Sequence, residues 1–242
     1  MVRVDWRDRV VVVTIDRPER RNAVDHATLL ALTEAQRDAV AGGARVMVLT
    51  GAPPAFCAGA DLNGVENDEF VGALARALHG FTSLGLVTVA AVDGPALGAG
   101  TQLAVACDLR MATPTSTFGV PAAKLGLAVD RWTVDRVERE FGGSVARAML
   151  LAAQSYTAEQ LHAAGGVQRL GGLAEALVWA EELANLAPLT IQAHKLALES
   201  TVATADVDER FERARLAAWQ SADAEEGRTA FLEKRPPLFR GD

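Results

Sequence analysis

The sequence contains little cysteine and no surplus of positive charge. Its two cysteines, Cys57 and Cys107, stand in apolar stretches of small residues, which indicates reduced and buried thiols. Neither the cysteines nor the four scattered histidines have the spacing of metal ligands, so we expect no metal and no resident cofactor. A net charge of −7, with no stripe of Lys and Arg, argues against a nucleic-acid partner.

Long apolar runs are also missing. No window approaches the eighteen apolar residues of a membrane span, and the N-terminus lacks the charged-then-apolar layout of a secretion signal. We therefore expect no membrane span and a cytoplasmic location. Half of the 242 residues are apolar, which is enough to bury a full hydrophobic core.

The first three-quarters of the chain alternates strand and helix patterns. Short β-branched runs predict strands, and apolar residues at every third or fourth position predict helices. The expected strands are 9–16, 44–51, 86–94 and 109–113, and the expected helices are about 25–40, 66–84 and 98–107, with another starting at Pro121. This order predicts an α/β fold with right-handed crossovers and a mostly parallel sheet.

The remainder of the chain is helical in pattern. The stretch "TAEQ" (157–160) is a capping box, residues 173–187 are amphipathic, and helical patterns follow over about 189–200, 207–221 and 223–234. We place a boundary near Ala187, between an α/β core (1–187) and a helical segment (188–242). That segment is too small to have its own core, so we expect it to pack on the core or on neighbouring subunits.

Two loops have the composition of a binding site. "AFCAGADL" (55–62) has no side chain larger than cysteine between Phe56 and Asp61, so a ligand can approach its backbone N–H groups closely. "GPALGAGTQ" (94–102) opens a helix, where free N–H groups and the positive end of the helix dipole favour negative charge.

These loops, together with "RPERRNAV" (17–24), "CDLRMA" (107–112), "FGVP" (118–121) and "FLEKRPP" (231–237), resemble the enoyl-CoA hydratase/isomerase, or crotonase, family over essentially the whole chain. The resemblance implies a spiral of ββα units closed by C-terminal helices. It also implies a homotrimer or homohexamer that binds fatty acyl-CoA thioesters.

The resemblance further assigns ligand contacts. It implies that the thioester carbonyl accepts hydrogen bonds from the N–H groups of Ala58 and Ala99, which form an oxyanion hole; Ala99 stands where relatives commonly have glycine. The implied substrate-binding residues are Arg20, Arg21, Ala58, Gly59, Ala60, Asp61, Leu62, Gly98, Ala99, Trp132 and Lys234. Lys234 matches a basic residue near the CoA phosphates, although a solvated surface charge is an equal interpretation. For Asp61, hydrogen bonds to local backbone donors are an interpretation equal to ligand contact.

The two glutamates that family hydratases use to activate water are replaced by Gln102 and Ala122. Glutamine can hydrogen-bond a water molecule but cannot exchange a proton, and alanine does neither. Because each lost general acid or base typically costs ~10²–10⁴-fold in rate, we expect hydratase activity to be weak or absent. Gln102 either contacts the ligand or is a helix residue without function.

Asp130 is the remaining candidate catalytic residue. Some crotonase relatives place an active carboxylate at this position, but an aspartate here also suits the N-cap of the helix that follows, and we favour the capping interpretation. Trp132 is either a core residue or a contact of the acyl chain, and we favour the second.

Three functions follow as hypotheses. The first is an acyl-CoA carrier or scaffold in fatty-acid or lipid metabolism. The second is an active family enzyme, such as a hydratase, isomerase or thioester hydrolase, that uses Asp130. The third is a structural subunit with a vestigial groove.

Overall fold

The computed structural model describes residues 1–61, 68–200 and 205–242. In chain order its strands are β1 (Val2–Arg7), β2 (Val10–Ile15), β3 (Val46–Gly51), β4 (Val87–Val92), β5 (Pro95–Leu97), β6 (Leu109–Ala112), β7 (Thr117–Gly119), β8 (Tyr156–Thr157) and β9 (Arg169–Leu170). Its helices are η1 (Pro18–Arg20), α1 (His26–Ala41), α2 (Asp68–Ser83), α3 (Ala99–Ala106), η2 (Pro121–Leu125), α4 (Arg131–Phe141), α5 (Gly143–Leu151), α6 (Ala158–Ala163), α7 (Leu173–Ala184), α8 (Pro188–Glu199), α9 (Ala205–Gln220) and α10 (Ala222–Glu233).

The main sheet has the strand order β1-β2-β3-β4-β6-β9, and every neighbouring pair except β1 and β2 is parallel. A second, smaller sheet has the order β5-β7-β8. Strands β4 and β6 therefore belong to the main sheet, while β5 and β7, which directly follow them in the chain, belong to the small one. This repetition of two strands and a helix is the expected spiral of ββα units, and the parallel sheet is confirmed.

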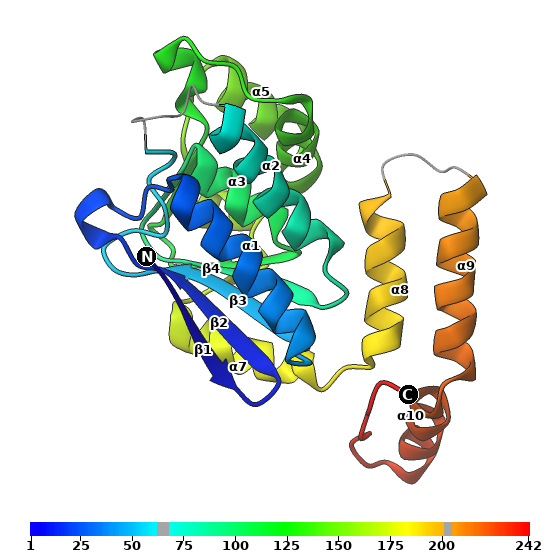
Figure 1. Cartoon of the computed structure of the whole chain (residues 1–242). Helices are drawn as coiled ribbons and strands as arrows, with labels where there is room; N and C mark the ends of the chain where they lie inside the picture. The colour runs from blue at the N-terminus through cyan, green and yellow to red at the C-terminus, as the bar shows by residue number, and fades with distance from the viewer. Residues whose placement is uncertain (62–67, 201–204) are drawn as a thin grey trace.

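Both faces of the main sheet are covered by helices (Figure 1). Helices α1, α2 and α3 lie over one face, where alternate residues such as Val11 and Val13 join the larger hydrophobic cluster. Helix α7 covers the other face, where Val46 and Val48 pack with Trp179. Burial on both faces explains why β2 is a continuous run of apolar and β-branched residues, all of them buried.

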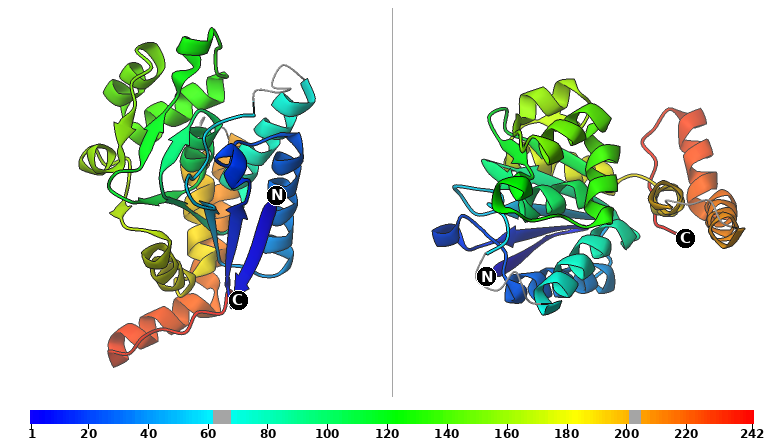
Figure 2. Two further views of the ribbon diagram at one scale, coloured as in Figure 1. Left: turned by 90° about the vertical axis from the view of Figure 1, so that its left-hand side faces the viewer. Right: turned by 90° about the horizontal axis from the view of Figure 1, so that it is seen from above.

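The last three helices extend away from the sheet (Figure 2). Their bounds agree with the expected patterns, and Ala187, the expected boundary, is the N-cap residue of α8. Buried Lys195 of α8 is nevertheless bound to the core: its Nζ lies 2.7 Å from Oδ2 of Asp108 and also donates to the carbonyls of Phe81 and Leu86, at 2.9 and 3.0 Å. A second buried cation, Arg136 of α4, pairs with Glu199 at 2.6 Å.

Two local features differ from the expectation. Strand β1 has no equivalent in the expected elements, although its sequence VRVDWR alternates apolar and charged residues; five of its six residues are exposed. Pro121 starts only the five-residue 3₁₀ helix η2, which ends at Gly126 in a left-handed conformation (φ 69°). Within the described ranges, no helix is long and apolar enough to cross a membrane.

Candidate functional site

A cavity of about 430 Å³ lies between the two small-residue loops, helix α2 and the segment 120–130. Its walls are mostly hydrocarbon. The described lining residues are Ala58, Gly59, Ala60, Phe70, Val71, Leu74, Ala75, Leu78, Gly98, Ala99, Gln102, Val120, Pro121, Ala122, Leu125, Leu127, Ala128, Val129 and Asp130. Among them, Asp130 is the only one with an ionisable side chain. The volume falls in the range of small-molecule sites.

The two loops converge because the first pairs with the strand that leads into the second. The N–H of Cys57 donates to the carbonyl of Pro95, and the N–H of Leu97 donates back to Cys57, both at 3.0 Å. This short parallel bridge brings the 55–61 loop alongside β5, directly before Gly98. The sequence-based expectation that both loops border one site is therefore met by the fold.

The N–H group of Ala58 is not free for a ligand. It donates to the carbonyl oxygen of Arg21 at 3.0 Å. The implied role of Ala58 as a donor to the thioester oxygen is therefore wrong, although its side chain does line the cavity.

Hydrogen-bonding directions alternate along the same loop, and this leaves the N–H of Ala60 available as a donor. Val24 donates to Gly59 at 2.9 Å and accepts from Asp61 at 2.8 Å, so the residue between them, Ala60, is bridged in parallel to Val24. In a parallel bridge of this kind, the N–H of the middle residue points away from its partner. Among the described residues no acceptor binds the N–H of Ala60, nor that of Ala99.

Glycine is required where α3 begins. Gly98 has φ 53° and ψ −116°, a conformation that L side chains rarely adopt. A Cβ at Gly100 would lie 2.1 Å from the carbonyl oxygen of Cys57, so only glycine permits the close packing of the two loops. Ala99 is the first residue of α3 and is not among the residues with positive φ, so its side chain does not strain the turn.

A buried asparagine fixes the segment against which the Ala60 loop pairs. Asn22 is fully buried in a left-handed conformation (φ 58°). Its Nδ2 donates to the carbonyls of Ala52 and Ala55, both at 2.6 Å, and its Oδ1 accepts from the N–H of Arg17 at 2.9 Å. The side chain therefore ties residues 17–24 to the start of the first loop.

The guanidinium of Arg17 adds an ionic link to the same loop. Its Nη2 lies 3.0 Å from Asp25 and 3.3 Å from Asp61. Burial acts to raise the pKa of Asp25, but hydrogen bonds from Thr28 and the charge of Arg17 outweigh it and lower the pKa. Asp61, an expected ligand contact, thus pairs with Arg17 and is absent from the described cavity lining.

Gln102 and Asp130 are brought together at the floor of the cavity through Thr133. Nε2 of Gln102 donates to Oγ1 of Thr133 at 2.7 Å, and the N–H of Thr133 donates to Oδ1 of Asp130 at 3.0 Å. Asp130 is the N-cap of α4, as the capping interpretation expects, and it also lines the cavity. Ala122 occupies the wall beside them and contributes only a methyl group.

Several expected contacts lie elsewhere. Arg20 and Arg21 are exposed at η1, outside the described cavity lining. Trp132 packs against His79, with ring centroids 5.3 Å apart and ring planes tilted by 44°, and is likewise outside that lining, so the favoured acyl contact is not found. Lys234 ends α10, which lies well apart from α3 (Figure 1), so one chain alone does not bring it to this cavity. Leu62 lies outside the described residues.

The two cysteines are not activated as nucleophiles. Burial raises the pKa of Cys57 and of Cys107 to about 12, so both are protonated thiols near neutral pH. In the described ranges, no group of three or more His, Cys, Asp or Glu side chains is placed to hold a metal ion.

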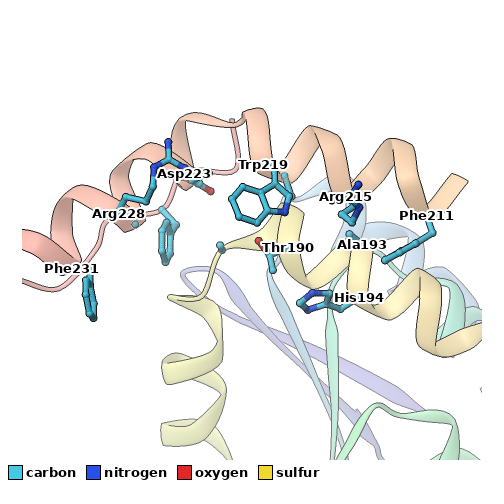
Figure 3. Close-up of a pocket in the computed structure, with 14 residues that line it drawn as sticks. Thr190, Ala193, His194, Phe211, Arg215, Trp219, Asp223, Arg228 and Phe231 are labelled. Carbon is cyan, nitrogen blue, oxygen red and sulfur yellow. The ribbon is translucent and has the colours of Figure 1, made fainter. Parts of the chain in front are cut away.

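A larger cavity of about 710 Å³ lies among the C-terminal helices (Figure 3). There Thr190 and His194 of α8 face Trp219 and Arg215 of α9. Its described lining comes from α8, α9 and α10 together with Ala187 and Phe239, and includes neither of the two small-residue loops. The cavity between the two loops is therefore the better candidate for chemistry.

Comparison with known proteins shows the family of the chain. The model of the enoyl-CoA hydratase/isomerase family matches residues 5–242. The chain belongs to the enoyl-CoA hydratase/isomerase family. A Mycobacterium tuberculosis protein named as a probable enoyl-CoA hydratase, echA6, is 41% identical over 246 residues, with 100% of both chains covered. The 2,3-dehydroadipyl-CoA hydratase of Escherichia coli is 36% identical, covering 98% of each.

Solved structures of the enoyl-CoA hydratase/isomerase family share the fold. The crystal structure of enoyl-CoA hydratase EchA1 from Mycobacterium marinum superposes with a TM-score of 0.89 at 36% identity, covering 100% of this chain and 99% of the other. The crotonase-like α/β fold expected from the sequence is therefore confirmed.

Sequence reasoning missed three kinds of residue in this member of the family. It did not single out Thr133, which only the fold places beside Gln102. Nor did it single out Arg17 and Asn22, whose side chains hold residues 17–24 against the first loop. It also did not identify the face of α2 that lines the cavity, although the spacing of Phe70, Leu74 and Leu78 is a usable helical signal.

Proposed function

We propose that the protein binds fatty acyl-CoA thioesters in the cavity between its two loops and hydrates them weakly or not at all. The family binds acyl-CoA thioesters. The observation that carries the proposal is the cavity itself: two free N–H groups, at Ala60 and Ala99, beside a glutamine and an alanine where a hydratase needs carboxylates.

In this proposal the thioester carbonyl oxygen accepts from both N–H groups. Ala99 also contributes the positive end of the α3 dipole, which favours the partial negative charge of that oxygen. The acyl chain then lies along Phe70, Leu74 and Leu78 of α2. Each methylene buried on this apolar wall is worth about 0.8 kcal/mol, so chain length contributes directly to affinity.

Hydration needs a proton donor and acceptor beside the acyl chain, and the residues at the positions of the two family glutamates provide neither. The amide of Gln102 does not titrate, and its Nε2 is engaged by Thr133. The side chain of Ala122 has no polar atom. A protein that holds the thioester without consuming it suits a carrier or scaffold in fatty-acid or lipid metabolism.

The test pairs binding with turnover. Calorimetry with a long-chain acyl-CoA should show binding, while absorbance at the enoyl thioester band should show little or no hydration of crotonyl-CoA. The double variant Gln102→Glu with Ala122→Glu should gain hydration, whereas Ala122→Glu alone should not. Turnover comparable to ordinary hydratases in the unmodified protein would refute the proposal, and no binding at millimolar thioester would favour a vestigial groove.

A backbone variant tests the donor pair. Proline is tolerated at the first position of a helix but has no N–H. Ala99→Pro should therefore keep the fold, checked by circular dichroism and melting temperature, and weaken thioester binding at least about tenfold. Ala222→Pro, at the exposed first position of α10, where no described acceptor binds the N–H, is the matched control and should bind normally.

A second candidate is an active enzyme that uses Asp130, because this carboxylate lines the cavity as well as capping α4. If it acts as a base or nucleophile, Asp130→Asn should abolish a measurable isomerase or thioesterase turnover while acyl-CoA binding persists. If no product forms with either protein across a panel of acyl-CoA thioesters, this candidate is excluded.

We also propose a homotrimer or homohexamer. The support is that α9 and α10 extend from the core and expose large apolar side chains, including Trp219, Phe231 and Leu232, at 66, 82 and 79%. Within such an assembly Lys234 would meet the CoA phosphates of a ligand bound to a neighbouring copy. Light scattering coupled to gel filtration should give three or six times the chain mass of 25.5 kDa.

A further inference from the structure

Helix α3 has its two ends in different environments. All of its residues, Ala99–Ala106, are buried. Its first turn borders the cavity, where Ala99 and Gln102 belong to the lining. Its last turn lies at the opposite end, where a helix leaves backbone carbonyls that need hydrogen-bond donors. The groups that bind this far end therefore help to decide how the whole helix is held.

Two buried guanidinium groups bind the far end of α3. Nη1 of Arg110 donates to the carbonyls of Ala104 and Cys107, at 3.3 and 2.9 Å. Nε of Arg136 donates to the carbonyl of Val105 at 2.6 Å. Both arginines are buried. Cations are favourable here because they meet the negative end of the helix dipole.

Arg136 also connects this end of α3 to the C-terminal segment. Its Nη1 lies 2.6 Å from Oε2 of Glu199, the last residue of α8. Glu140 joins the two guanidinium groups, because its Oε2 pairs with Arg110 and its Oε1 lies 3.4 Å from Nη2 of Arg136. A single side chain of α4 therefore bonds α3 and α8 at the same time.

The shortness of α3 makes this connection relevant to the cavity. The helix spans only about 12 Å, so a displacement at Val105 is passed to Ala99. Hydrogen bonds weaken steeply when donor and acceptor are misaligned. The donor at Ala99 is effective only if it is aimed at the ligand oxygen before the ligand arrives.

We propose that Glu199 and Arg136 are positioning residues of the thioester site. Glu199 holds Arg136, Arg136 holds the last turn of α3, and α3 directs the N–H of Ala99 at the thioester oxygen. The inference rests on the proposed binding of acyl-CoA thioesters. It couples the docking of α8 to occupation of the cavity, so each strengthens the other.

The carbonyl stretching band of a bound thioester reports this alignment. The probe is hexanoyl-CoA isotopically labelled at its thioester carbonyl, which has no double bond to hydrate. On the unmodified protein the infrared band should lie at lower wavenumber than in buffer, because two aligned N–H groups polarise the carbonyl. Glu199→Leu should lose about half of this shift, since one of two donors is misaligned. Calorimetry should show binding weakened about three- to tenfold.

Further variants separate positioning from stability. Lysine cannot reproduce the two-sided contact of a guanidinium, so Arg136→Lys should behave like Glu199→Leu. Glu199→Gln keeps an oxygen for Arg136 and should restore most of the shift. Arg45→Met is the matched control: Arg45 donates to the carbonyls of Ala184 and Phe239, neither of them in α3. It should lower the melting temperature and keep the full band shift at saturating ligand.

The coupling can also be measured without any variant. Because coupling is reciprocal, saturating hexanoyl-CoA should slow amide hydrogen exchange in α8 of the unmodified protein. This measurement tests the inference even if Glu199→Leu does not fold.

The outcomes distinguish this inference from the proposed function. If hexanoyl-CoA binds but Glu199→Leu keeps the full shift and affinity, or binding leaves the exchange of α8 unchanged, the coupling is refuted and acyl-CoA binding stands. If Arg45→Met loses as much of the shift as Glu199→Leu, the route through Arg136 is refuted. If hexanoyl-CoA does not bind the unmodified protein, the proposed function fails, and the inference fails with it.

Discussion

Replacing Lys195 by methionine should destabilise the fold, because this lysine is the main ionic link between α8 and the core. Its side chain is 8% exposed, and its ammonium group contacts the Asp108 carboxylate and two backbone carbonyls. Methionine keeps the hydrocarbon stem but leaves Asp108 charged without its cation. It also leaves the carbonyls of Phe81 and Leu86 without their donor.

The expected loss is about 3 kcal/mol. Removing one partner of a buried ion pair typically costs about 3–5 kcal/mol. Asp108 is 19% exposed and still accepts from the N–H and hydroxyl of Thr88, at 2.7 and 2.8 Å, which favours the lower end. For a chain of this length the loss corresponds to a fall in melting temperature of roughly 6–12 °C.

Urea unfolding followed by circular dichroism measures the effect, with Lys124→Met as the control. Lys124 is exposed, so its loss should change stability by no more than about 0.5 kcal/mol. The double variant Lys195→Met with Asp108→Asn should lose clearly less than the sum of the single losses, because each single change leaves an unpaired group. A loss below about 1 kcal/mol for Lys195→Met, or strict additivity, would refute the reasoning.

The remaining predictions concern the thiols and the buried asparagine. Because burial raises the pKa of Cys57 and of Cys107 to about 12, neither should react with an aromatic disulfide reagent at pH 8 until the protein unfolds, and fast labelling of the native protein would contradict this. Above the ordinary thiol pKa of 9.0 the unfolded chain ionises both thiols while the folded chain keeps them protonated. The free energy of unfolding should therefore be constant with respect to these groups below pH 9.0 and decline above it, which urea titrations at pH 7 and 10 can measure. Asn22→Ala removes the donor of two buried carbonyls and places alanine at φ 58°, so we expect a loss of about 2–4 kcal/mol in urea unfolding, against little change for the exposed Asn185→Ala.

Helix starts and buried strands were predicted correctly, because their signals lie within short stretches of the sequence. The capping box of Thr157 and Gln160 begins α6, and Asp130 caps α4. Continuous β-branched runs became the buried strands β2, β3 and β4, because helices cover both faces of their sheet. Strand β1, which pairs with β2, was missed although the alternation of apolar and charged residues in VRVDWR is a usable strand signal.

The candidate site was only partly predictable, because its chemistry depends on pairing between distant segments. Small residues identified both loops, but not which N–H points into the cavity. Residues 21–24 set that direction, because the carbonyl of Arg21 accepts from the N–H of Ala58, whereas no described acceptor binds the N–H of Ala60. Likewise, the sequence shows a glutamine at position 102, but the orientation of its amide depends on Thr133, thirty-one residues later.

The clamp made by Asn22 has a thermodynamic consequence for binding. Because it holds residues 17–24 against the first loop, the N–H of Ala60 is oriented before any ligand arrives, and little chain entropy remains to be lost on association. Amide hydrogens of residues 22–24 and 57–61 that are already bonded should therefore exchange slowly in the free protein. The protection of these amides from hydrogen exchange should rise little when a ligand binds. The site is thus preorganised, so little of the binding free energy is lost to ordering the loop.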